Sequence, residues 1–152
     1  MKKISVLLFA LTISIAAFAQ IEAPVKWAYK AKRLGPNEAV ILMKANIQPG
    51  WHIYSQTLKP GGPIKTSFKF APSKHYALIG TPIEPTPKIK YEKDFKMNVG
   101  YFVKEVVFQQ KIKTKTTSPI DVKGSLEYAV CNSIKCLPPE ELAFNIPLNK
   151  KL

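Results

Sequence analysis

Residues that carry most catalytic and metal chemistry are scarce in this chain. Its 152 residues include only two cysteines and two histidines. These numbers exclude a metal cluster that needs more than four Cys or His ligands, and they exclude a small fold held together by several disulfides. Gly61-Gly62 lies between prolines, which is typical of a turn and not of a phosphate-binding loop. We therefore expect neither a cofactor nor a bound metal.

Arginine is almost absent, although the chain is strongly basic. Of 23 basic residues, against ten acidic ones, only Arg33 is an arginine, and the formal net charge is +13. Such a charge is compatible with binding to nucleic acid, to a membrane surface or to an acidic partner. Recognition of phosphates and bases favours the arginine fork, and the lysines are scattered along the chain. We therefore expect a solvated lysine-rich surface and no nucleic acid partner, while an acidic protein partner stays open.

Long hydrophobic runs are absent after residue 19. Residues 1–19 combine a basic start at Lys2-Lys3, a short apolar run and an Ala17-Phe18-Ala19 cleavage site, which predicts a signal peptide. An uncleaved N-terminal anchor is the alternative. Residues 20–152 then form a single domain that is periplasmic or otherwise exported, with no stable insertion in the membrane after cleavage. In such a compartment a cysteine pair can persist as a disulfide.

Helical periodicity is also missing, and a period of two dominates the mature chain. Apolar and polar residues alternate over 25–32, 64–70, 121–130 and 142–146, while 39–47 and 99–108 are longer and more apolar strand candidates. Turn signals separate these segments at short spacing, which predicts an all-β fold, either an antiparallel β-sandwich or a small closed barrel. The proline-rich segment 80–96 is expected to be a long surface connection. Six aromatic residues are expected in the core: Trp27, Trp51, Phe68, Phe70, Phe102 and Phe108.

The two cysteines, Cys131 and Cys136, lie close together between two predicted strands. Their sulfurs are within bonding reach if their Cβ vectors agree. A disulfide closing so short a loop contributes roughly 2 kcal/mol, which is modest for a domain with its own core. A structural bridge and an exchanging bridge both stay open at this point. Zinc is disfavoured because His52 and His75 do not follow at zinc-finger spacing. A cysteine nucleophile with a histidine base is a further alternative, although each histidine is expected to be a surface or half-buried residue.

Three motifs resemble one family. The cysteine motif reads Tyr128-x-x-Cys131-x4-Cys136-Leu137-Pro138-Pro139-Glu140. An aromatic strand, Gly50-Trp51-His52-Ile53-Tyr54, comes before a Pro-Gly-Gly-Pro turn, and Lys93-Asp94-Phe95 comes before a long strand. In this order the motifs resemble the N-terminal domain of the thiol:disulfide interchange protein DsbD, over most of residues 21–149.

The resemblance implies an immunoglobulin-like β-sandwich and a thiol-disulfide interchange activity linked to cytochrome c biogenesis. Cys131 and Cys136 would be the redox pair, Phe95 the cap that shields the pair, and Asp94 and Tyr54 the residues that shape the site. An acidic group beside the sulfurs would raise the thiol pKa and slow unwanted exchange. The implied partners are thioredoxin-like periplasmic proteins and a membrane electron donor on another chain.

The chain departs from the family pattern at three points. Four residues separate its cysteines, where the best-known members have five, and Phe95 is followed by Lys96-Met97 instead of tyrosine and glycine. The family's membrane-spanning and thioredoxin-like domains do not follow the motif. The expected protein is therefore a freestanding module, and the alternative is a binding or structural β-sandwich with a non-exchanging disulfide.

Overall fold

The computed structural model describes residues 22–149, and this range contains eleven β-strands and no helix. The predicted signal peptide lies outside the described residues. No helix within the described range is long and apolar enough to cross a membrane. The strands are β1 (Val25–Arg33), β2 (Glu38–Ile47), β3 (His52–Tyr54), β4 (Ser67–Phe70), β5 (Tyr76–Ile83), β6 (Lys88–Glu92), β7 (Met97–Phe102), β8 (Glu105–Thr114), β9 (Ile120–Tyr128), β10 (Val130–Cys131) and β11 (Glu140–Leu148).

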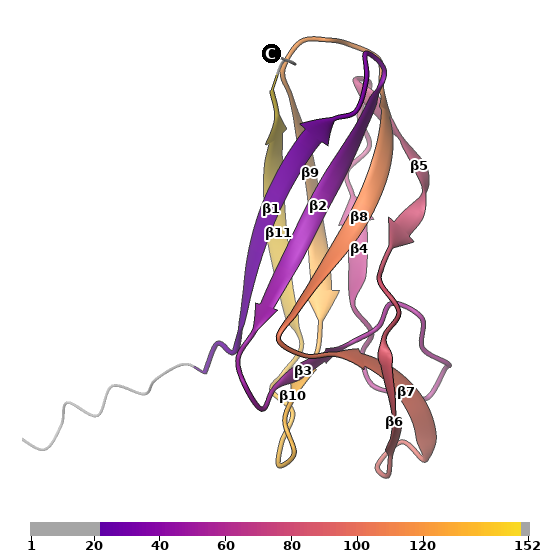
Figure 1. Ribbon diagram of the computed structural model, residues 1–152, viewed down its shortest axis with the longest axis vertical. Helices are drawn as coiled ribbons and strands as arrows, with labels where there is room; N and C mark the ends of the chain where they lie inside the picture. The colour runs from indigo at the N-terminus through magenta and orange to yellow at the C-terminus, as the bar shows by residue number, and fades with distance from the viewer. Residues whose placement is uncertain (1–21, 150–152) are drawn as a thin grey trace, which may run out of the picture.

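The strands form three antiparallel sheets. One large sheet has the order β1-β2-β8-β5, and a three-stranded sheet with the order β11-β9-β4 lies behind it along the long axis of the molecule (Figure 1). A small sheet, with the order β10-β3-β7-β6, extends from one end of this sandwich, away from the C-terminal end of the described chain (Figure 1). The predicted antiparallel β-sandwich is therefore confirmed, with a small sheet added at one end.

The main core fills the space between the first two sheets. Alternating residues of β2, β8, β9 and β11 point inward, so Ile41, Phe108, Val122 and Ile146 are almost fully buried. The six predicted core aromatics all lie in this core or pack against it. Gly124 of β9 lies under the ring of Phe144, where no side chain would fit. The predicted alternation is thus explained by burial of one face of each large sheet.

Arg33, the single arginine, closes the end of the sandwich opposite the small sheet. Its guanidinium donates hydrogen bonds to the backbone oxygens of Asn149, Thr116 and Ser118 and to Thr114 Oγ1, over 2.8–3.3 Å. The residue is only 9% exposed. The planar fork thus ties the ends of several strands together and is not available for recognition of phosphate.

Two expectations about chain segments were wrong. Residues 80–96 are not a long connection, because they contain the end of β5, all of β6 and a tight turn at 93–96. β5 and β6 are both edge strands, where the missing N–H of Pro82 costs no ladder hydrogen bond. Residues 99–108 are not one strand either. The chain bends at Lys104, which has φ of 65°, and passes from β7 in the small sheet to β8 in the large one.

A similar break places the cysteines. The segment predicted as one strand over 121–130 ends as β9 at Tyr128, and after Ala129 the chain continues as β10 in the small sheet. Val130 pairs with Ile53 and Cys131 pairs with His52 of β3. The change of sheet at Ala129 therefore carries the cysteines away from the main core to the end of the molecule.

Candidate functional site

The two cysteines form a disulfide at the base of a tight hairpin, residues 131–136, called the cysteine hairpin below. Cys131 and Cys136 are antiparallel bridge partners with Cα atoms 4.0 Å apart. Asn132 stabilises the turn, because its Oδ1 accepts hydrogen bonds from the N–H groups of Ile134 and Lys135, both at 2.8 Å. Cys131 is only 2% exposed, whereas Cys136 is exposed. The disulfide is therefore accessible from the Cys136 side.

The buried cysteine lies on a polar face of the small sheet. Directly paired residues of antiparallel strands place their side chains on the same face. His52 pairs with Cys131, and Tyr54 pairs with Tyr101 of β7. Lys90 of β6 occupies the same face, since it pairs with Val99, two residues from Tyr101. The register therefore brings a histidine, two tyrosines and a lysine to the side of the sheet that carries the buried cysteine.

Hydrogen bonds connect these side chains. The Lys90 ammonium donates to Glu92 Oε1 at 2.6 Å and to His52 Nε2 at 2.9 Å. The Tyr54 hydroxyl donates to Glu92 Oε1 at 3.2 Å. The same ammonium lies 5.1 Å from the centre of the Tyr101 ring, a cation–π contact. A lysine, a carboxylate, an imidazole and two phenols thus form one connected cluster.

Burial and neighbouring charges decide the ionisation of this cluster. Burial, followed by the charge of Lys90, lowers the pKa of His52 to about 4, so the imidazole is neutral at pH 7 and accepts the Lys90 hydrogen bond at Nε2. Burial opposes the charge of Glu92, but hydrogen bonds from Lys90 and Tyr54 outweigh it and hold the pKa of the carboxyl below its ordinary value. Burial, and then Glu92, raises the pKa of Tyr54. The cluster therefore contains one cation and one anion.

All five predicted site residues line a single cavity of about 410 Å³, called the site cavity below. Its walls are the cysteine hairpin, Tyr54, Lys90, Glu92 and the turn residues Asp94 and Phe95. Phe95 is half-buried and Asp94 is exposed. Both belong to the turn between β6 and β7, which brings them to the cysteines from another part of the chain. No group of His, Cys, Asp and Glu within residues 22–149 is arranged to hold a metal ion.

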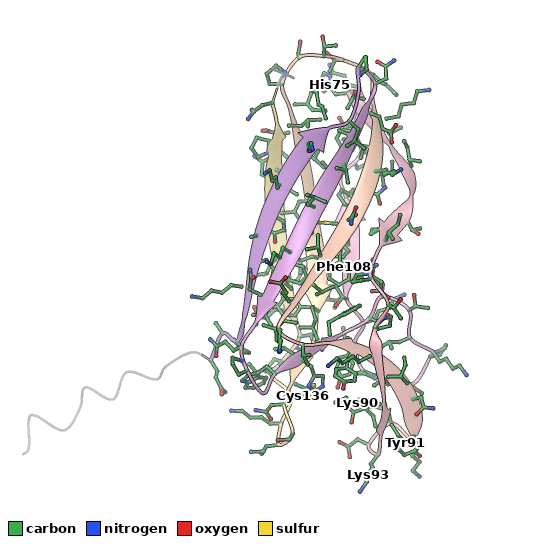
Figure 2. The ribbon with its side chains drawn as sticks, in the orientation of Figure 1. His75, Lys90, Tyr91, Lys93, Phe108 and Cys136 are labelled. Atoms are coloured by element: carbon green, nitrogen blue, oxygen red, sulfur yellow. A yellow bond between two sulfur atoms is a disulfide. The ribbon has the colours of Figure 1, made fainter. Side chains whose placement is uncertain are left out.

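Four members of the cluster, His52, Lys90, Glu92 and Tyr101, were not predicted as site residues. His52 is only 6% exposed, so the expectation of a surface or half-buried histidine was wrong for it, while His75 is exposed at the opposite end of the molecule from Cys136 (Figure 2). Lys90 and Glu92 belong to a segment that had been expected to be a loop. The period-two spacing of His52 and Tyr54 was the available signal, since it places both on one face of a strand.

The charge beside Cys136 is compensated. The side chain of Lys135 forms an ion pair with Glu22, at the start of the described chain, and both side chains are about half exposed. This pairing reduces the influence of Lys135 on a sulfur. Two lysines line the site cavity, Lys90 and Lys135, and the contacts of Lys90 are with residues of the small sheet.

Fold and site together define a β-sandwich domain that carries a disulfide, exposed on one side, at the end of the sandwich. The chain belongs to the family described as the N-terminal domain of the thiol:disulfide interchange protein DsbD, whose model matches residues 19–147. The suspected family is therefore confirmed. No curated protein matches the chain.

Two solved structures support the same fold. The N-terminal periplasmic domain of ScsB from Proteus mirabilis is similar over 82% of this chain, with a TM-score of 0.60 and 19% identity, and the match spans 46% of that chain. The N-terminal domain of DsbD from Neisseria meningitidis, in the reduced form, is similar over 80% of this chain and 85% of that one, with a TM-score of 0.50 and 18% identity. The expected immunoglobulin-like β-sandwich is thereby confirmed.

Proposed function

We propose that this protein is a periplasmic thiol-disulfide interchange module, which passes electrons through Cys131 and Cys136 between a membrane donor on another chain and thioredoxin-like proteins. The observation that carries the proposal is the asymmetric exposure of the disulfide. Cys136 is exposed beside a cavity, while Cys131 is 2% exposed and packs against Tyr54, Val99 and Ala129. Membership of the DsbD N-terminal family supports the same chemistry.

The exchange begins at the accessible sulfur. A thiolate of the donor attacks Cys136, the Cys131–Cys136 bond breaks, and Cys131 leaves as a thiolate that takes up a proton. The second thiolate of the donor then attacks the donor's own sulfur in the mixed disulfide and releases Cys136, which also takes up a proton. Two electrons and two protons have then moved, so this chain holds a dithiol and the donor a disulfide. The reverse steps reduce a thioredoxin-like acceptor.

The neighbours of the pair have separate roles in this proposal. Phe95 covers the cysteines until a partner docks, which its half-buried position on the cavity wall supports. Asp94 and Tyr54 shape the site. The Tyr54 hydroxyl is held by Glu92, and Asp94 lines the same cavity. A negative charge at Asp94 disfavours a thiolate nearby and limits exchange in the absence of a partner.

Trapping of a mixed disulfide tests which sulfur exchanges. Cys131→Ser keeps the accessible Cys136, and Cys136→Ser keeps the buried Cys131. Each is mixed with a thioredoxin that lacks its resolving cysteine and carries a thionitrobenzoate leaving group on the other. We expect Cys131→Ser to displace the leaving group and form the complex at least about ten times faster than Cys136→Ser, because access limits the attack. Equal rates, or loss of the fold in both variants, would contradict the proposal.

The redox equilibrium of the unmodified protein separates an exchanging bridge from a structural one. The purified mature protein is equilibrated with glutathione and with a thioredoxin-like protein, and free thiols are counted by alkylation. A rapid and reversible shift at an intermediate potential supports the interchange module. A pair that stays oxidised until the protein unfolds supports the alternative, a structural or binding β-sandwich in which the disulfide is a staple.

A further inference from the structure

Lys90 is a cation fixed on the wall of the site cavity. Its ammonium is held by Glu92 at 2.6 Å, by His52 Nε2 at 2.9 Å and by the face of the Tyr101 ring. The side chain is 30% exposed, so solvent screens its charge only in part. Lys90 lines the same cavity as the cysteine hairpin, whereas Lys93 lies farther out, in the turn between β6 and β7 (Figure 2). These three contacts fix the position of the ammonium, whereas the side chain of an ordinary surface lysine moves freely in solvent.

The buried cysteine gives this charge a role. Cys131 is 2% exposed and packs against Tyr54, Val99 and Ala129, and such burial disfavours the thiolate in the reduced protein. Exchange requires a thiolate, because the neutral thiol is a poor nucleophile. A cation on the same face of the sheet lowers the free energy of the thiolate and offsets the cost of burial.

Charged and titratable groups face this site from every element around it. His52 of β3 is neutral, and the Tyr54 hydroxyl of the same strand stays protonated at pH 7 because burial raises its pKa. The turn after β6 contributes the carboxylate of Asp94, and the cysteine hairpin contributes Lys135, which is paired with Glu22. On β6, Lys88, Lys90 and Glu92 share this face, and of these Lys90 and Glu92 line the site cavity. Since Asp94 and Glu92 disfavour a thiolate, Lys90 is the group that opposes them.

We propose that Lys90 is a positioning residue for thiol-disulfide exchange, whose ammonium, held by Glu92 and His52, stabilises the thiolate of the Cys131/Cys136 pair and sets the pH range in which the reduced pair reacts. This inference rests on the proposed function and deepens it. Glu92 acts through Lys90, since it compensates part of the lysine charge. His52 acts in its neutral form, since only the unprotonated Nε2 accepts the hydrogen bond from the ammonium.

Two substitutions with opposite expected effects on the thiol pKa test the inference. Lys90→Met removes the cation, and we expect the apparent pKa of the reactive thiol to rise by about one unit. Glu92→Gln removes the compensating anion and still offers an oxygen to Tyr54, so the apparent thiol pKa should fall. Lys90→Arg should keep the wild-type value within experimental error. A purely structural role for the pair would shift both variants in the same direction or leave both unchanged.

The measurement is the rate at which iodoacetamide alkylates each cysteine of the reduced protein between pH 5 and pH 11, read separately for Cys131 and Cys136 by mass spectrometry. The pH dependence of the rate gives the thiolate fraction of each thiol. Lys93→Met is the matched control, because Lys93 is an exposed lysine of the adjacent turn that does not line the site cavity. Urea unfolding of each variant identifies any loss of the fold. If Lys90→Met fails to fold, Glu92→Gln alone decides, and an unchanged or raised thiol pKa in it overturns the inference.

No partner protein takes part in this titration. If Lys90→Met and Glu92→Gln shift the thiol pKa in the expected opposite directions but trapping fails, the proposed interchange function is rejected. The role of Lys90 in setting the thiol pKa then stands. Trapping that succeeds while Lys90→Met and Glu92→Gln leave the thiol pKa unchanged would reject the inference and keep the function.

Discussion

Cys131 and His52 stand directly opposite each other in the β10–β3 ladder, and each is less than a tenth exposed. Their side chains therefore share one face of the small sheet. The Nε2 atom of His52 accepts a hydrogen bond from Lys90 and lies 3.4 Å from the Tyr54 hydroxyl oxygen, and within residues 22–149 no hydrogen bond joins the imidazole to a sulfur. This arrangement differs from a cysteine–histidine nucleophile pair, which needs the imidazole within hydrogen-bond reach of the thiol.

The neutral, buried His52 predicts a loss of stability in weak acid. Its pKa is about 4 in the folded protein, below the ordinary 6.5, so the unfolded chain binds the proton first as the pH falls. The contribution of His52 is fully present above pH 6.5 and is lost between pH 6.5 and pH 4, by on the order of 2 kcal/mol. Urea unfolding at a series of pH values measures this loss.

Carboxylates also change the stability of a protein as the pH falls. Two histidine variants separate the contribution of His52 from theirs. His52→Gln should show a flatter stability profile between pH 6.5 and pH 4 than the wild type. His75→Gln should keep the wild-type slope, since His75 is exposed at the opposite end of the molecule. Identical slopes for His52→Gln and the wild type would contradict the neutral, desolvated imidazole.

Removal of the Phe95 ring should expose the disulfide. Phe95 is half-buried and lines the site cavity with both cysteines. In Phe95→Ala we expect dithiothreitol to reduce the oxidised protein about five times faster, because access limits attack on the sulfur. The rate is followed by quenching with an alkylating agent. Tyr91→Ala is the control, since Tyr91 is 60% exposed and lies outside the cavity wall, and an equal acceleration there would argue against a cap.

Ile134 offers an apolar contact to a partner protein. It lies in the turn of the cysteine hairpin and is 89% exposed, a large exposure for an isoleucine next to a disulfide. Ile134→Asp should slow exchange with a thioredoxin-like protein by roughly five- to tenfold and leave reduction by dithiothreitol unchanged. Ile79→Asp, on the outer strand β5, is the control. Equal slowing of both reactions by Ile134→Asp would indicate a damaged hairpin instead of a lost contact.

Gly124 predicts a strong effect on the sandwich itself. A Cβ atom at this position would lie 2.2 Å from the backbone oxygen of Lys69 and 2.5 Å from Cζ of Phe144. Because the first neighbour is backbone, relief requires the sheet to move, and Gly124→Ala should lower the free energy of unfolding by about 3 kcal/mol. The midpoint of urea unfolding measures the change. Gly35→Ala has no neighbour within 4 Å and should leave the midpoint nearly unchanged.

The sequence by itself determined the class of fold, the family and the members of the candidate site that belong to motifs. The period of two along β1, β9 and β11 is visible in the chain because each strand buries one face. The cysteine pair was visible from its spacing, whereas Tyr54, Asp94 and Phe95 followed from the resemblance of short motifs to one family, and all five residues line one cavity. Local patterns suffice for these features because alternation and short motifs depend on neighbours in the chain.

Only the tertiary structure decided how these strands are joined and which charges meet. The breaks at Ala129 and Lys104 send the chain from one sheet to another, and neither interrupts the apolar pattern clearly enough to be seen in advance. His52 and Lys90 are 38 residues apart and meet because β3 and β6 pair with opposite edges of β7. The burial of Cys131 and the exposure of Cys136 follow from the same packing, since a period of two assigns residues to faces but leaves open which face another strand covers.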